Sequence, residues 1–393
     1  MTTGEPCLAA ERQDAVDLLQ QAVRIDTVSP SGDERRLARL LQTRLRKAGV
    51  DGEIDELGDK RANLIARLDG GKPGPCVVLS GHMDTVAAGT VPWRHGPFDA
   101  VLEDGRIYGR GTVDMKSGLL ALMFAFLRFA RRDRSSWSGT LVFAATSNEE
   151  TGAQGAKAMV HDGRLPRFDA LIIGEPTDRR LVIAHKGVLW TRICSCGKAA
   201  HGSMPDAGVN AIDKLFSFYC RLGNVDLASQ RHDLLTPATL AVTTVNGGTQ
   251  VNVIPDRCDL TLDIRTVPGQ VHDAVRAQLR RLIQEASAAD AASQLEMETL
   301  LDLPGVATDP QAELVKVAQE TLREAGLAST TPVGANYFTD ASVLQALGKN
   351  IIVLGPGNPR LAHQVDEHVL VDDYVECIDI YDGILKKFLA YRQ

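Results

Sequence analysis

Apolar residues in the first 180 positions fall into two kinds of pattern, and each kind predicts a different element. Residues 8–24 and 33–48 repeat apolar side chains at helical spacing, which predicts two amphipathic helices. The segment of about 117–131 is apolar on most sides, which predicts a helix covered on both sides, as in a layered α/β domain. Short runs rich in Val, Ile and Leu, bounded by glycine or polar turns, predict strands. These strands are expected at 63–68, 76–79, 106–108, 140–146 and 170–173.

The order of elements changes between residues 187 and 303. The pattern there predicts, in sequence, strand 187–196, helix 208–222, strand 238–246, strand 257–266, helix 270–288 and strand 294–301. This β-α-β-β-α-β order is that of the ferredoxin-like split βαβ fold. An α/β pattern then resumes and ends with a helix of about 371–391. We therefore expect a layered α/β/α domain formed by residues 1–186 and 304–393, with a ferredoxin-like α+β domain of residues 187–303 inserted into it.

Length and composition indicate a globular protein of two domains and argue against nucleic-acid-binding and membrane proteins. The 393 residues are enough for two domains, and the contents of 44% apolar and 24% charged residues are those of a globular protein. The net charge of −7, without any run rich in Lys or Arg, argues against nucleic acid as a partner. The longest apolar segment, 118–127, is far shorter than the roughly twenty residues that cross a bilayer, so no membrane association is expected.

The expected compartment is the cytoplasm. The seven cysteines are an odd number and show no framework spacing, which indicates a reducing environment. The first twenty residues lack a basic region followed by an apolar core, so we expect no signal peptide.

Residue types that bind metals follow three of the predicted strands. His82 and Asp84 end the first, Glu149 and Glu150 follow the second, and Glu175 follows the third. One such turn would be read as an ordinary polar surface turn. Ligands bind at the carboxyl ends of strands in an open α/β sheet, so the repetition predicts one shared site. Residues two apart in extended chain point the same way, so Asp84 can orient the imidazole of His82.

A hydrolytic site with two metal ions needs further groups. The ions lie about 3.5–4 Å apart and share a bridging carboxylate, and a carboxylate that is not a ligand must take a proton from water. Asp114, in the glycine-rich loop 109–118, is the candidate bridge, because neighbouring glycines let the backbone turn tightly. His363 is the candidate second histidine. Imidazole and carboxylate ligands suit zinc or cobalt.

Two alternatives stay open at this point. Glu149 and Glu150 are adjacent, so one is expected to be a ligand and the other the base, and the sequence does not say which. The loop 109–118 could instead bind phosphate, which would make this a nucleotide-binding protein. It matches neither GxxxxGK[ST] nor GxGxxG, the two patterns that cradle phosphates in such proteins.

Seven ordered motifs resemble those of the M20 family of metallo-amidohydrolases and peptidases. They are GHMDTV, GRGTVDMKSG, SNEETG, GEPTD, AAHGSMP, NVIPDRCDLTLDIR and AHQVDEH. The resemblance spans residues 10–385 of the chain. The family includes acetylornithine deacetylase, succinyl-diaminopimelate desuccinylase, aminoacylase and bacterial glutamate carboxypeptidase. The resemblance implies a catalytic domain with a dinuclear metal centre, and an inserted domain that serves as lid and dimerisation domain.

The resemblance also implies roles for residues of the first domain. His82, Asp114 and Glu175 would bind one metal ion, and Asp114, Glu150 and His363 the other. The ions would be zinc, with cobalt as the alternative. Asp84 would be the partner of His82, and Glu149 the general acid and base. The peptide bond after Asp114 would be cis.

Three residues of the inserted domain receive roles in the same way. His201, which from its neighbours alone reads as a turn histidine, would stabilise the oxyanion of the tetrahedral intermediate, often across a dimer interface. Arg265 would bind the α-carboxylate of the substrate together with Asn252. From the residues alone, Arg265 could equally pair with Asp263 or Asp259.

The expected protein is therefore a homodimeric zinc-dependent hydrolase that cleaves the amide bond of a small N-acyl amino acid. The motifs GEPTD and HQVDE favour the acetylornithine deacetylase and succinyl-diaminopimelate desuccinylase branch. An exopeptidase of the same family, acting on a dipeptide or a short peptide as a dipeptidase or glutamate carboxypeptidase does, is the first alternative. A catalytically silent metal-binding relative is the alternative that is not an enzyme.

Overall fold

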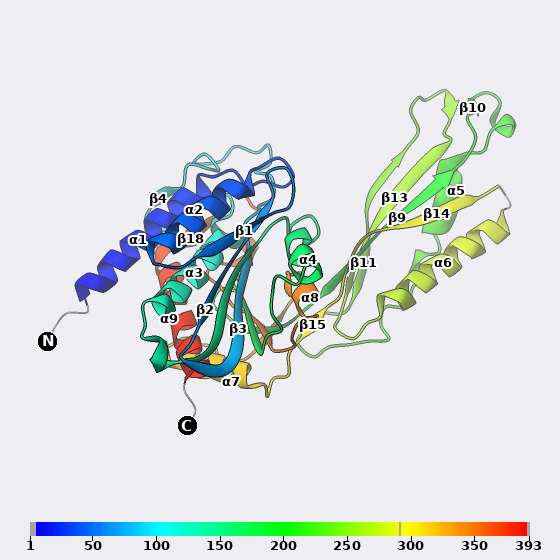
Figure 1. The fold of residues 1–393 in the computed structure, drawn as a ribbon. Helices are drawn as coiled ribbons and strands as arrows, with labels where there is room; N and C mark the ends of the chain where they lie inside the picture. The colour runs from blue at the N-terminus through cyan, green and yellow to red at the C-terminus, as the bar shows by residue number, and fades with distance from the viewer. Residues whose placement is uncertain (1–4, 291, 391–393) are drawn as a thin grey trace. The chain divides into compact units, whose positions relative to one another are not determined.

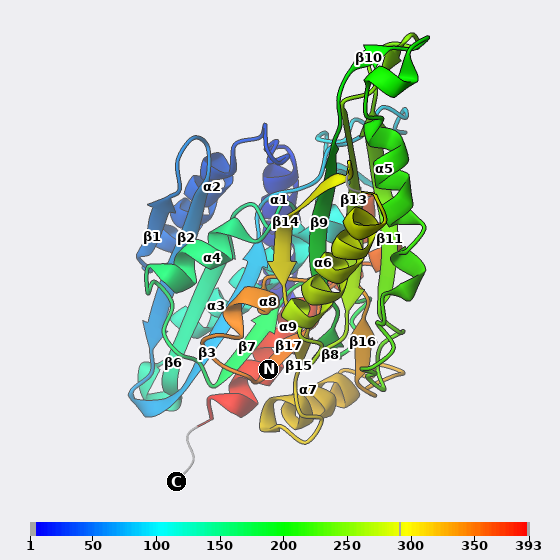
Figure 2. The same cartoon turned by 90° about the vertical axis from the view of Figure 1, so that its right-hand side faces the viewer.

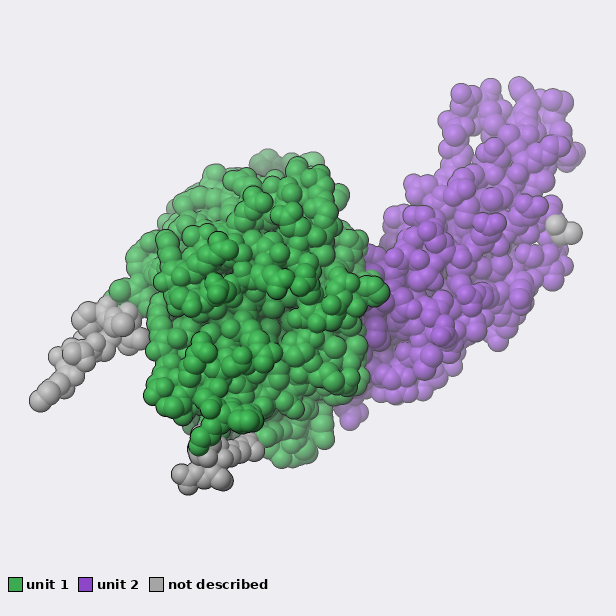
Figure 3. Space-filling model, viewed as in Figure 1, with its two compact units in different colours: residues 1–183, 307–333, 339–393 green, residues 184–306, 334–338 purple. Residues whose placement is uncertain are grey.

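The computed structural model describes residues 5–290 and 292–390 of the chain. Its contacts divide the chain into two compact units, coloured separately in Figure 3. Unit 1 contains residues 1–183, 307–333 and 339–393, and unit 2 contains residues 184–306 and 334–338. None of the helices in the described part of the chain has the length and apolar composition that a membrane span needs.

A nine-stranded mixed sheet forms the centre of unit 1, and its strands β8, β15 and β16 lie where the chain passes from one unit to the other. Its order is β1-β2-β6-β3-β7-β17-β8-β15, and β16 pairs with β8. The strands are β1 (Gly52–Glu56), β2 (Ala62–Asp69), β3 (Lys72–His82), β6 (Ser138–Thr146), β7 (Ala170–Ile173), β8 (Val182–His185), β15 (Val306–Ala307), β16 (Val333–Ala335) and β17 (Ile351–Val353). Because β6, β3, β7 and β17 are parallel neighbours, their carboxyl ends lie along one edge of the sheet.

Helices cover both faces of this sheet, which gives the predicted α/β/α layers. They are α1 (Glu5–Val23), α2 (Glu34–Lys47), α3 (Ser117–Ala130), α4 (Gln154–His161), α7 (Glu313–Glu324), α8 (Ala341–Leu344) and α9 (Val371–Phe388). Figure 1 shows α1, α3 and α9 on one face, and α4 and α8 on the other. Every residue of α3 except Arg128 and Ala130 is buried, as its apolar composition predicted. A small sheet of β18 (His368–Leu370), β5 (Arg106–Tyr108) and β4 (Val101–Glu103) completes the unit.

Unit 2 has the predicted ferredoxin-like arrangement. Its antiparallel sheet has the order β11-β13-β9-β14, and α5 (Ala211–Tyr219) and α6 (His272–Ala289) lie together on one face (Figure 2). The strands are β9 (Gly187–Cys196), β11 (Thr239–Gly247), β13 (Arg257–Thr266) and β14 (Gln294–Leu303), and a two-stranded sheet joins β10 (Ala200–His201) to β12 (Val253–Ile254). In β13, buried positions alternate with partly buried ones, so one face of the strand packs into the core below the helices.

The structure also contains elements that the apolar pattern did not predict. β1 is a short edge strand with the polar sequence GEIDE, and α4 has only eight residues. Neither is long or periodic enough to produce a clear signal in the sequence. β4 is a strand of three residues in a part of the chain where no strand was predicted.

Three glycines let the backbones of unit 1 approach closely where ligand-bearing segments meet. A Cβ atom at Gly118, near the start of α3, would lie 1.7 Å from the carbonyl oxygen of Gly174. A Cβ atom at Gly355, after β17, would lie 2.3 Å from the same oxygen. Side chains at these positions would push the segments apart, so glycine is required for this packing. The contact sets the spacing between the loop that precedes α3 and the end of β7.

We predict that Gly118→Ala destabilises the protein, because the added methyl group would overlap the backbone of Gly174. The free energy of unfolding should fall by about 3 kcal/mol or more, and urea denaturation measures this change. Gly223→Ala is the matched control, since Gly223 is exposed and a Cβ atom there would meet nothing within 4 Å. Equal urea midpoints for the two variants would contradict the prediction.

Candidate metal centre

The predicted ligands of unit 1 lie along the edge where the parallel strands end. His82 is the last residue of β3, Glu150 follows β6 and Glu175 follows β7. Asp114 lies in a distorted helical turn, Thr112–Lys116, directly before α3. His363 comes from a turn in the segment between β17 and β18 and has a left-handed backbone with φ 63°. Five residues from five separate segments thus reach one place.

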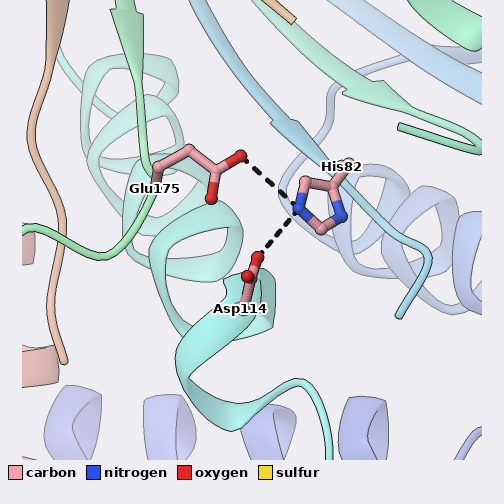
Figure 4. A group of neighbouring side chains, drawn as sticks. All are labelled: His82, Asp114 and Glu175. Atoms are coloured by element: carbon pink, nitrogen blue, oxygen red, sulfur yellow. Dashed lines mark hydrogen bonds and ion pairs between the residues drawn. The ribbon is translucent and has the colours of Figure 1, made fainter. Parts of the chain in front are cut away.

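The first group of side chains is His82, Asp114 and Glu175 (Figure 4). Nε2 of His82 lies 3.0 Å from Oδ1 of Asp114 and 3.4 Å from Oε1 of Glu175. On the other side of the ring, Nδ1 lies 2.9 Å from the backbone carbonyl oxygen of Asp84. A carbonyl can only accept, so Nδ1 carries a proton, and Nε2 is the ring nitrogen that could bind a cation beside the carboxylates.

The second group is Asp114, Glu150 and His363. Nε2 of His363 lies 3.2 Å from Oδ2 of Asp114 and 3.1 Å from Oε1 of Glu150. Asp114 therefore turns one oxygen toward each group, which is the geometry of a bridging ligand. In both groups the candidate ligand atoms lie within 4.8 Å of one another. The peptide bond between Asp114 and Met115 is cis, as the resemblance implied.

The clustered carboxyl groups of the site create a negative environment that favours the binding of cations. Burial, together with the charge of Asp114, raises the pKa of Glu175 to about 8. Burial and the charge of Asp114 also raise the pKa of Glu150. Hydrogen bonds to Asp114 and Glu150 raise the pKa of His363 to about 10. The two carboxylates therefore stabilise the positive charge of the protonated imidazole. Nitrogen and oxygen ligands of this kind fit zinc or cobalt, and divalent ions would supply the missing charge.

The structure separates the two neighbouring glutamates, whose roles the residues alone left open and the resemblance assigned. Glu150 belongs to the second ligand group, whereas Glu149 belongs to neither. Glu149 is nonetheless buried, and this burial raises the pKa of its carboxyl group well above the ordinary value. A buried carboxyl group beside the ligands, but not among them, is the arrangement that a general base requires.

Asp84 does more than the sequence predicted. Its Oδ1 lies 3.5 Å from Nδ1 of His82, whereas the ring's close partner is the backbone carbonyl of Asp84. The carboxylate instead accepts the backbone N–H of Glu149 at 2.9 Å and that of Glu150 at 3.1 Å. The hydroxyl of Ser29 donates to it at 2.9 Å. Asp84 therefore orients His82 through its main chain and holds the Glu149–Glu150 turn through its side chain.

The glycine-rich loop is occupied by a carboxylate of the same chain. Oε1 of Glu367 accepts the N–H groups of Gly111, Val113 and Asp114 at 3.0, 2.8 and 3.2 Å. In a phosphate-binding loop, these N–H groups would donate to the phosphate. Here they already donate to Glu367, which argues against phosphate binding by this loop. Sequence reasoning missed Glu367, because no spacing rule pairs residues more than 250 positions apart. Its place in the AHQVDEH motif was the one available signal.

His201 and Asn252 lie near one end of unit 2. His201 of β10 pairs with Val253 of β12, and the N–H of Gly202 donates to the carbonyl of Asn252 at 2.7 Å. His201 is exposed, and its Nδ1 lies 2.8 Å from the hydroxyl of Ser203. The roles of His201 and Asn252 at the metal centre stay predictions.

Arg265 lies at the other end of unit 2. It pairs with Asp263 through two hydrogen bonds of 2.7 and 2.9 Å, which is one of the alternatives raised by the sequence. Arg257, at the opposite end of β13, pairs with Cys196, shortly before β10. Eight residues of extended strand span roughly 27 Å, so Arg265 and His201 of one chain cannot touch the same small molecule.

Comparisons of the sequence with known proteins identify the family of this chain. The model of the family described as peptidase family M20/M25/M40 matches residues 78–387. The chain is 30% identical over 413 residues to a probable succinyl-diaminopimelate desuccinylase of Staphylococcus aureus, which covers 97% of this chain and 98% of the relative. It is 32% identical over 363 residues to acetylornithine deacetylase of Myxococcus xanthus, which covers 89% and 90%.

Solved structures show the same fold at low sequence identity. An M20 family metallo-carboxypeptidase of Sulfolobus solfataricus has a TM-score of 0.80 at 19% identity, which covers 95% of this chain and 99% of that one. A dinuclear metal-binding peptidase of the M20 family from Bacillus subtilis has a TM-score of 0.73 at 17% identity, which covers 97% and 99%. The combination of a layered α/β unit with a separate antiparallel unit is therefore shared with M20 structures.

We predict that Asp84→Asn weakens the metal centre while the fold is retained. An amide has one acceptor atom, so Glu149 or Glu150 would lose the partner of its backbone N–H. Metal affinity or turnover should fall by about 10–100-fold, as for other residues that orient ligands, and titration of the apoprotein with Co²⁺ measures the affinity. Ser29→Ala, which removes a hydroxyl that contacts both Asp84 and the side-chain oxygen of Asn148 and leaves the carboxylate intact, is the milder control. Wild-type values for both affinity and turnover in Asp84→Asn would show that this carboxylate does not organise the site.

Proposed function

The chain belongs to peptidase family M20/M25/M40, and from this premise we propose that it is a dinuclear zinc hydrolase that cleaves the amide bond of a small N-acyl amino acid. The observation that carries the proposal is the pair of ligand groups that share Asp114, with Glu149 buried beside them. Cobalt is the alternative ion, because the same nitrogen and oxygen ligands suit it.

The side chains divide the chemistry between them. His82, Asp114, Glu150, Glu175 and His363 would hold two divalent ions, and such ions would polarise a carbonyl group and make water more acidic. Glu149 takes the proton of the attacking water and passes it to the nitrogen of the leaving amine. Asp84 holds the Glu149–Glu150 turn, so the base and its neighbouring ligand keep their relative positions. His201 donates a hydrogen bond to the oxyanion of the tetrahedral intermediate.

The substrate class rests on the relatives and on Arg265. The two relatives described above are named as a desuccinylase and a deacetylase, both of which remove an acyl group. An N-acyl amino acid carries an α-carboxylate, which the guanidinium fork of Arg265 can bind in two places. Arg265 would then have to share its donors between the substrate and Asp263. Asn252 is the second candidate partner of the carboxylate.

The geometry of unit 2 favours an active site built from two chains. His201 and Asn252 lie at the end of the sheet opposite to Arg265, so they can serve one small substrate together only if they come from different protomers. β11 is one of the two edge strands of the sheet, and an edge strand presents unpaired N–H and C=O groups. Beside it lies an apolar groove of about 440 Å³ whose lining includes the exposed side chains of Phe216, Tyr219 and Val245. A second copy of the chain is the occupant that we propose for this face.

We predict that Glu149→Ala lowers kcat by about 10²–10⁴-fold and leaves the metal content unchanged, because Glu149 acts on the proton and does not bind the ions. The assay would use acetylornithine, succinyl-diaminopimelate and a panel of dipeptides, with metal analysis of the same samples. Glu150→Ala is the comparison, and it should lose metal. Loss of metal in Glu149→Ala would mean that the roles of the two glutamates are reversed.

The substrate panel also separates the alternatives. Wild-type turnover of dipeptides without turnover of the acylated amino acids would favour an exopeptidase. A wild-type protein that binds two ions and hydrolyses none of the amides would be a catalytically silent relative.

We predict that two inactive variants, Glu149→Ala and His201→Ala, complement each other when they are mixed. If His201 acts in the partner's site, a mixed dimer has one complete site, formed by Glu149 of one chain and His201 of the other. Random exchange makes half of the dimers mixed, so about a quarter of wild-type activity should return. Subunit exchange under mild denaturant followed by an activity assay tests this. No recovery in dimers shown to have exchanged would place His201 in the site of its own chain.

A further inference from the structure

We propose that Glu367 is a positioning residue that holds Asp114 and His363 in the arrangement needed to bind two ions. Glu367 is not a candidate ligand, and its side chain is fully buried. The inference rests on the proposed metal centre and adds a residue on which both ions depend.

The carboxylate of Glu367 fixes the main chain of the loop that carries Asp114. One oxygen, Oε1, accepts three N–H groups, and the last of these belongs to Asp114 itself at 3.2 Å. Three amides that converge on one oxygen form an anion-binding concavity, which here holds an anion of the same chain. The loop needs this anchor, because Gly109 and Gly111 have φ values of 151° and 84°, and such glycines add conformational freedom when nothing restrains them.

The same residue joins this loop to the segment that carries His363. Glu367 lies four residues after His363, and its backbone carbonyl accepts the N–H of Gly109 at 2.9 Å. Directly after it, His368 of β18 pairs with Tyr108 of β5. The segments of Asp114 and His363 are thus connected through both the main chain and the side chain of Glu367. Because Asp114 faces both ligand groups, a displacement of its loop would change both sites.

Arg110 balances the buried charge. Its Nη1 donates to Oε2 of Glu367 at 2.5 Å, and only 2% of its side chain is exposed. Its Nη2 donates to the carbonyl of Ala87 at 3.2 Å, and its guanidinium group lies 5.1 Å from the ring centre of Trp93. A buried ion pair leaves an uncompensated charge when one partner is removed, so Glu367 and Arg110 depend on each other.

We predict that Glu367→Gln weakens the binding of both ions by about 10–100-fold. The NH₂ group of the glutamine would face the N–H donor of Arg110, and two donors repel each other. If the side chain turns to avoid this, its NH₂ group faces the loop N–H groups, which then lose their acceptor. Stepwise titration of the apoprotein with Co²⁺, followed by visible absorption, measures each binding step. Glu150→Gln serves as the comparison, because it should weaken the step of one ion, whereas Glu367→Gln should weaken both steps. With excess cobalt, the kcat of Glu367→Gln should approach that of the wild type.

Glu11→Gln is the matched control for a structural effect. Glu11 accepts two hydrogen bonds from Arg128 in the same unit, at 3.0 and 2.6 Å, and takes no part in either ligand group. Its replacement should lower the urea midpoint and leave both cobalt affinities unchanged. Glu367→Asp keeps the charge but is one methylene shorter, so it should lose affinity by a smaller factor. It also tests the inference if the glutamine variant does not fold.

The outcomes separate the two proposals. A wild-type apoprotein that takes up no Co²⁺ would overturn the metal centre itself. If the wild type binds two ions and both Glu367 variants bind them with wild-type affinity, the metal centre stands and the role of Glu367 is refuted.

Discussion

The shared carboxylate of Asp114 is the interaction on which the rest of unit 1 depends. Its two oxygens face two histidines, 3.0 and 3.2 Å away, that are separated by 281 positions in the sequence. Burial of several carboxyl groups around one point is unfavourable without positive charge, which is why their pKa values rise. The site is therefore built for cations, and most of the surrounding structure keeps Asp114 at the point where both histidines reach it.

Two kinds of restraint hold this arrangement. The parallel strands β3, β6 and β7 place three ligand-bearing ends at one edge of the sheet, which is the general location of ligand sites in such sheets. Close backbone contacts and buried carboxylates then set the finer geometry. Gly118 and Gly174 bring the start of α3 against the end of β7, Asp84 holds the turn after β6, and Glu367 holds the loop before α3. The strands thus place the ligand-bearing segments at one edge of the sheet, and the hydrogen bonds fix the positions of the ligand atoms there.

Unit 2 adds a constraint of another kind. Its sheet is a rigid spacer of roughly 27 Å between Arg265 and the end that carries His201. A substrate of amino-acid size cannot bridge that length, so the use of both ends in one reaction requires two protomers. The apolar groove beside the edge strand β11 is consistent with this, because large exposed apolar patches mark interaction surfaces. Dimerisation and catalysis would then depend on the same unit.

Local pattern in the sequence determined the fold class and the types of ligand. Apolar runs predicted the buried strands and α3, the β-α-β-β-α-β order predicted the sheet of unit 2, and metal-binding side chains at three strand ends predicted one site. These features depend on residues close together in the chain, where periodicity is visible. The residues alone left open which of Glu149 and Glu150 is a ligand, the family resemblance assigned Glu150, and the structure places Glu150 in a ligand group. Only the tertiary structure decided that Asp84 holds the N–H groups of both and that Glu367 fills the glycine-rich loop. Each of these depends on hydrogen bonds between residues tens to hundreds of positions apart, and no local spacing encodes such contacts.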